Sequence, residues 1–148
     1  MKKTLCLVAI LLLLVGVILS ERAIAQPKTN LTKDNLTLLE GTWEGSADFA
    51  VGVSVRLVLV INNNSLPLEG KISFLNIPVG RADLFPGRFS GSTYEGNFDN
   101  GTITNKGDLI ITGQGGNFGE FSLSKDQKKL TGWFYLWGAR GTMTLKKK

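Results

Sequence analysis

The sequence predicts an all-β protein, a single antiparallel up-and-down barrel of about eight to ten strands. Beyond residue 38, apolar and polar residues alternate with a period of two, which is typical of half-buried strands. Asn, Asp and Gly recur about every 8 to 12 residues, as expected of successive tight hairpins. A closed barrel hides its strand edges, and glycines within the predicted strands favour the sharp coiling that a barrel needs. These glycines are Gly45, Gly70, Gly96, Gly113 and Gly132.

The first 25 residues have the features of a secretory signal peptide. Lys2 and Lys3 precede an uninterrupted apolar run from Leu5 to Leu19, and Ala23-Ile24-Ala25 supplies a small-x-small cleavage pattern. The apolar run is shorter than the roughly 20 residues that a membrane-spanning helix needs. We therefore expect a secreted or periplasmic protein that begins at Gln26 and has no stable membrane insertion after cleavage.

Two charged residues, Glu21 and Arg22, stand just before the cleavage pattern and keep an alternative open. In that alternative the signal stays uncleaved and anchors the chain to a membrane by its N-terminus.

The composition restricts the chemistry that the chain can perform. The 148 residues include no histidine, and the single cysteine, Cys6, lies in the predicted signal. Ser-His and Cys-His nucleophile pairs are therefore excluded, together with the commonest metal ligand. We predict that the protein is not an enzyme and has no cofactor or metal. Its positive charge is concentrated in the signal and in the C-terminal run 146–148, which predicts no nucleic-acid partner.

The predicted domain organisation is a signal peptide (1–25), a flexible N-terminal arm (26–38) and one barrel domain (39–148). The arm is polar and rich in Asn and Thr. Asp99-Asn100-Gly101 is predicted to be a hairpin turn. The first strand opens at Gly41, and the further predicted strands are 51–61, 68–74, 81–85, 88–98, 102–104, 108–113, 119–124, 130–137 and 141–146.

Gly41-Thr42-Trp43 at the start of the first strand and Arg140 just before the last one resemble the calycin group of barrels (lipocalins, fatty-acid-binding proteins and avidins). The resemblance implies that Trp43 packs under a basic residue from the last strand, here Arg140, and so closes the narrow end of the barrel. The lipocalin mid-chain motif and the lipocalin disulfides are absent, and the biotin-contacting residues of avidins have no counterparts.

One strand carries an aromatic ladder that is a candidate binding surface. Trp133, Tyr135 and Trp137 are spaced by two residues, so all three rings share one face. Such a face suits flat ligands, sugar faces or the side chains of a partner. In the alternative, the three rings fill the core, and Phe134 and Leu136 lie on the surface.

Arg56 and Arg88 are candidate anchors for an anionic ligand, because an arginine inside a barrel can hold a carboxylate through two hydrogen bonds. In the alternative, each arginine points outward and covers apolar surface. Tyr94, in an aromatic strand segment, completes the predicted ligand-binding set.

The predicted function is the binding of a small hydrophobic or anionic lipid-like ligand inside the barrel, with its mouth at the loops 77–88 and 113–116. Two alternatives remain. The first is a protein-binding module that inhibits a protease by threading the arm 26–38 into its active site. The second is a filled structural barrel without a ligand.

Overall fold

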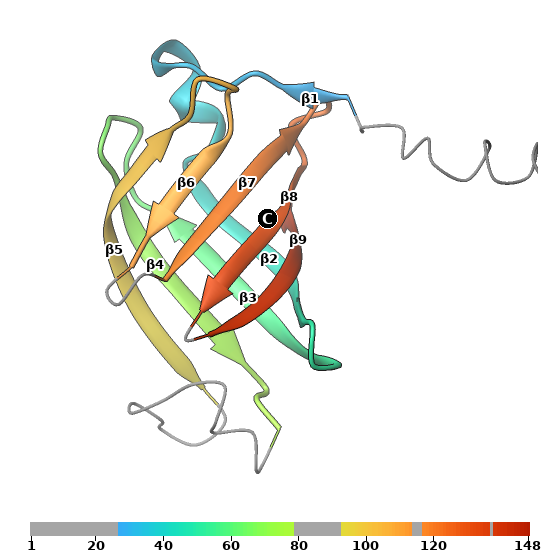
Figure 1. Cartoon of the computed structure of the whole chain (residues 1–148). Coiled ribbons are helices and arrows are strands. Elements are labelled where there is room, and N and C mark those ends of the chain that lie inside the picture. Colours follow the sequence, from blue (N-terminus) through green and yellow to red (C-terminus); the bar gives the residue numbers. More distant parts are fainter. Residues whose placement is uncertain (1–26, 79–92, 114–116, 137) are drawn as a thin grey trace, which may run out of the picture.

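The computed structural model describes residues 27–78, 93–113, 117–136 and 138–148, and it confirms the all-β prediction. Strands β2 to β9 follow one another around a closed antiparallel barrel of eight strands, because β2 pairs with β9 and β7 pairs with β8 (Figure 1). The elements are β1 (Lys28–Thr29), the 3-10 helix η1 (Lys33–Leu38), β2 (Gly41–Phe49), β3 (Val53–Ile61), β4 (Leu68–Leu75), β5 (Tyr94–Ile103), β6 (Leu109–Thr112), β7 (Phe118–Ser124), β8 (Lys129–Leu136) and β9 (Ala139–Lys147).

The period-two pattern sets the inside and outside of the wall. In β3, Val55, Leu57 and Leu59 are buried and alternate with Ser54 and Arg56, which are exposed. The strand starts two residues later than predicted. Burial of one face by the barrel interior explains why the alternation persists along the whole strand.

The N-terminal segment corrects the prediction of a flexible arm. β1 pairs with the end of β7, and η1 lies across one end of the barrel (Figure 1). Leu31 and Leu36 are each only 2% exposed, and Leu39 is completely buried. The Asn/Thr-rich composition predicted an exposed segment, but Leu31 and Leu36 fill the closed end of the barrel. The segment is therefore part of the core.

A salt bridge fastens the start of this segment to the barrel wall. The Lys28 ammonium lies 2.7 Å from the buried Asp108 carboxylate and also donates a hydrogen bond to the carbonyl of Lys106. The same carboxylate accepts a hydrogen bond from the Ser122 hydroxyl at 2.6 Å. A buried carboxylate with these partners fixes where the chain enters the barrel.

The predicted pair of Trp43 and Arg140 does not form. Trp43 is completely buried at the closed end and donates its indole N–H to the carbonyl of Leu39 at 2.7 Å. Lys147, its register partner on β9, places its ammonium 5.3 Å from the indole centroid and donates to the carbonyl of Leu38. A basic residue from the last strand does cover the tryptophan, but Arg140 lies near the start of β9, at the opposite end of the barrel.

The predicted turn 99–101 is also wrong, because β5 continues through it. The register between β4 and β5 shifts there, so that Asp99 and Asn100 form a bulge instead of a hairpin turn. A Cβ atom on Gly101 would come within 2.8 Å of Leu68, which explains why a glycine follows the bulge.

The predicted signal, the predicted strand 81–85 and the first residues of the predicted strand 88–98 lie outside the described residues. Among the residues that are described, no helix is long and apolar enough to cross a membrane.

Candidate functional site

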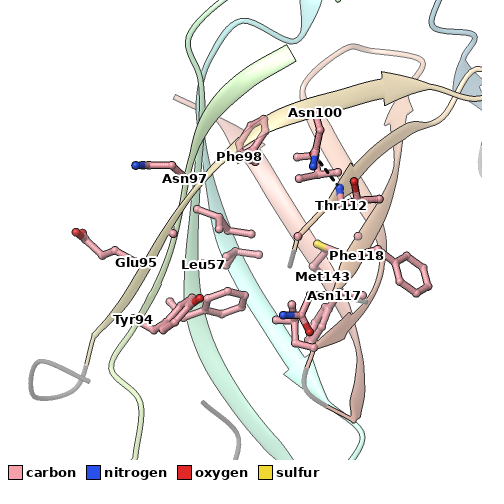
Figure 2. A pocket seen from close by; sticks show the side chains of 18 of the residues that line it. Leu57, Tyr94, Glu95, Asn97, Phe98, Asn100, Thr112, Asn117, Phe118 and Met143 are labelled. Atoms are coloured by element: carbon pink, nitrogen blue, oxygen red, sulfur yellow. Dashed lines mark hydrogen bonds between the residues drawn. The ribbon is translucent and has the colours of Figure 1, made fainter. Parts of the chain in front are cut away.

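A cavity of about 630 Å³ occupies the half of the barrel opposite η1 (Figure 2). This is the end at which β2, β4, β6 and β8 finish. Polar and apolar groups contribute about equally to its surface, and the side chains that line it from the inner face of the wall are aliphatic and aromatic. They are Leu57, Phe74, Tyr94, Phe98, Ile111, Phe121, Phe134, Leu136 and Met143.

Three phenylalanines from different strands pack together beside this cavity. The ring centroids of Phe49 and Phe134 are 4.9 Å apart, and the two rings pack edge to face. The centroid of Phe49 is 6.4 Å from that of Phe74. Phe74 in turn lies 6.2 Å from the ring of Tyr94, so the aromatic cluster continues to the cavity wall on β5. Edge-to-face packing fixes ring orientations, which gives the cavity a defined apolar surface. Sequence analysis missed this cluster because its members are far apart along the chain.

Gly96 leaves space in the wall of the cavity. It lies on the inner face of β5 between Tyr94 and Phe98. A Cβ atom there would make only ordinary contacts, at 3.6 Å from the Tyr94 hydroxyl and 3.8 Å from Ile72. A larger side chain at this position would therefore project into the cavity without backbone strain.

Beside the cavity, β5 and β6 separate, and we call the unpaired part of the wall between them the opening. These strands pair only at Thr102↔Ile110 and Ile103↔Leu109. At the point where they separate, the Asn100 side-chain oxygen accepts a hydrogen bond from the Thr112 backbone N–H at 3.2 Å (Figure 2). Beyond that point, residues of β5 on one side and Thr112, Gly113 and Asn117 on the other line the cavity.

Glu95 lies on the outer face of β5 beside this opening, and its charge is neutralised by β4. Its carboxylate is 2.7 Å from the Lys71 ammonium and accepts a hydrogen bond from the Ser73 hydroxyl. The hydrogen bond from Lys71 is the main cause that holds the pKa of Glu95 below its ordinary value. Figure 2 shows Glu95 and Asn97 pointing away from the cavity.

Arg56 does not enter the barrel, so the predicted anion anchor on β3 is wrong. Its side chain is half exposed on the outer face and forms a salt bridge with Glu44 of β2. Lys148 contacts the same carboxylate at 2.9 Å. The hydrogen bond from Lys148, followed by that from Arg56, holds the pKa of Glu44 below its ordinary value.

Of the remaining predicted ligand residues, Tyr94 lines the cavity. Arg88 and Trp137 lie outside the described residues, and so do Gln114, Gly115 and Gly116 of the predicted mouth loop.

Trp133 and Tyr135, the two rings of the aromatic ladder that the structure describes, point outward from β8, whereas Phe134 and Leu136 face the interior. This reverses the alternative in which the ladder rings fill the core. On the outer surface, Trp133 packs edge to face with Phe118 at 4.7 Å and donates to Glu120 at 3.0 Å. The Arg140 guanidinium lies 5.4 Å from the Trp133 ring centroid, and Phe118 also contacts Tyr135. Trp133 and Tyr135 thus contact other side chains on the outer surface and do not line the cavity, whereas Phe118 lies at its rim.

The described residues contain no group of three or more Cys, Asp or Glu that could hold a metal ion. Comparisons with models of protein families, with curated proteins and with solved structures found no match for this chain. The class that the structure defines is a closed eight-stranded antiparallel barrel with a cavity in one half, lined on its inner wall by apolar side chains.

Proposed function

We propose that this chain is an exported, non-enzymatic binding protein that holds a small, mostly apolar ligand in the open half of the barrel. The observation that carries the proposal is the cavity of about 630 Å³, which is within the usual range for small-molecule sites. The resemblance to calycins points in the same direction, since those barrels hold ligands inside. The signal-like segment 1–25 supports export to the periplasm or beyond the cell.

The side chains of the site favour an apolar ligand over a lipid anion. Within the described residues, the side chains of the inner wall are uncharged, and the predicted anchor Arg56 points to solvent. Removing an apolar ligand from water into such a space is favourable in proportion to the area that is buried. The polar atoms at the opening include the Thr112 and Asn117 side chains. They then face the end of the ligand that stays exposed to solvent.

The proposal also accounts for the unfilled interior better than a structural barrel does. Empty space in a core costs dispersion contacts, so a barrel with only a structural role gains stability by filling it. Inward-facing Gly96 is a position where a larger side chain would do so without strain.

The test uses a cavity-filling variant and a neutral fluorescent probe, N-phenyl-1-naphthylamine. Gly96→Leu places a side chain in the cavity, so we expect probe affinity to fall by at least about tenfold while the free energy of unfolding is kept or increased. Thr102→Leu places a leucine on the outer face of the same strand, at an exposed residue that does not line the cavity, and is expected to leave probe binding unchanged.

Native mass spectrometry of the exported protein, purified without detergent, gives a second measurement. A discrete adduct that organic extraction removes from the wild type, and that Gly96→Leu does not carry, is the expected result. Equal probe binding by wild type and both variants would show that the cavity is not the site. Absence of both probe binding and an adduct would leave the filled structural barrel as the better description.

A further inference from the structure

The side opening exposes a backbone edge in the wall of a barrel that is otherwise fully paired. From Glu95 to Phe98, β5 pairs with β4 on one side and with no described strand on the other, and its ladder with β6 begins at Thr102. The backbone groups of residues 95–99 that point away from β4 have no partner strand in the described part of the chain. A strand edge of this kind is a template for another extended chain.

The dimensions of the edge suit a short peptide. Residues 95–100 span about 17 Å, at roughly 3.3 Å for each residue of a strand. A strand that pairs with this edge directs alternate side chains to the inner face of the wall, where the cavity begins. The cavity is therefore placed to receive apolar side chains from every second residue of the added strand, as in other cases of strand addition.

The charge beside the edge indicates the character of the other face of the added strand. Glu95 and Asp99 are exposed on the outer face of β5 and flank the opening. Lys71 pairs with Glu95, but no described residue forms a salt bridge with Asp99. Outward side chains of an added strand therefore meet a net negative charge, which favours Lys or Arg.

We infer that the opening between β5 and β6 binds an extended peptide by strand addition, with bulky apolar side chains in the cavity and basic side chains outside. This inference rests on the proposed function, because it uses the same cavity, and it names a class of ligand for it. It also places contact with a protein partner at β5 rather than at segment 26–38, whose leucines are buried in the barrel.

The test measures fluorescence anisotropy of a fluorescein-labelled peptide, Lys-Phe-Thr-Phe-Thr-Phe-Lys, with the full barrel. Two further peptides keep the same side chains but carry N-methyl groups on the Phe nitrogens or on the Thr nitrogens. Because N-methylation removes the backbone donor, we expect at least one of them to bind about tenfold more weakly or worse. Amide hydrogen exchange should slow within residues 95–99 when the unmethylated peptide binds.

The outcomes separate this inference from the proposed function. Binding of N-phenyl-1-naphthylamine without saturable peptide binding overturns the strand addition alone. Equal binding of all three peptides also overturns it, since side chains alone would then explain the affinity. Failure of both probe and peptide refutes the cavity as a binding site. Displacement of the probe by the peptide, lost in Gly96→Leu, is the result that supports both.

Discussion

Leu36→Ala tests whether the segment before the first barrel strand is structural. Leu36 lies in η1 at the closed end and is 2% exposed. Burying a leucine side chain contributes about 1.5–3 kcal/mol. Truncation of a buried leucine to alanine also leaves a cavity, so the expected loss is about 2–5 kcal/mol in the free energy of unfolding. The measurement is urea unfolding, followed by tryptophan fluorescence and by circular dichroism.

Thr37→Ala is the matched control for this substitution, because Thr37 is the next residue of η1 and is exposed. Its effect should stay within about 0.5 kcal/mol. Probe binding should survive Leu36→Ala, since the cavity lies in the other half of the barrel. A loss below about 0.5 kcal/mol for Leu36→Ala would refute the assignment of this segment to the core and restore the flexible arm.

Two further predictions concern charged side chains near the closed end. Lys147→Met should lower the free energy of unfolding by about 0.5–2 kcal/mol, because it removes the cation over Trp43 and the hydrogen bond to Leu38. Glu44→Gln should reduce the fall in the free energy of unfolding that the wild type shows as the pH is lowered into the acid range. The pKa of Glu44 is lowered in the folded protein, so its contribution is complete above the ordinary glutamate pKa and is lost as the pH falls through the folded value.

Both predictions have matched controls within the chain. Lys146→Met changes the neighbouring exposed lysine, and its effect on unfolding by urea should be smaller than that of Lys147→Met. Glu69→Gln changes an exposed glutamate for which the described residues supply no salt bridge, and its stability profile at acid pH should follow the wild type. Equal effects within either pair would contradict the contacts assigned to Lys147 or Glu44.

The fold could be predicted because alternation and turn chemistry act locally. In β3, apolar and polar side chains alternate, and the structure places them inside and outside as expected. In β8 the same reasoning left two choices, because Trp133 and Tyr135 on one face are as apolar as Phe134 and Leu136 on the other. The contacts that distinguish the two faces come from β7 and β9. Phe118 of β7 and Arg140 of β9 pack against the Trp133 ring on the outer surface. Such tertiary contacts are not visible along one strand.

The errors at the closed end have a similar cause. Leu31 and Leu36 are five residues apart in a polar segment, so no period predicted their burial. The choice of Arg140 over Lys147 as partner of Trp43 followed proximity to the start of the last strand. In an antiparallel pair, the residue opposite the start of one strand lies near the end of the other, which here is Lys147.

The cavity itself depends on small residues more than on the aromatic ones that first draw attention. At the closed end, inward positions carry Trp43, Leu59 and Leu145, and these side chains are completely buried. In the open half, Gly96 and Gly119 take inward positions on β5 and β7, and both line the cavity. A side chain at Gly119 would press on Phe121 and Met143, whereas one at Gly96 would meet only ordinary contacts. Gly96 is therefore the position at which a single substitution separates the binding role of the barrel from its stability.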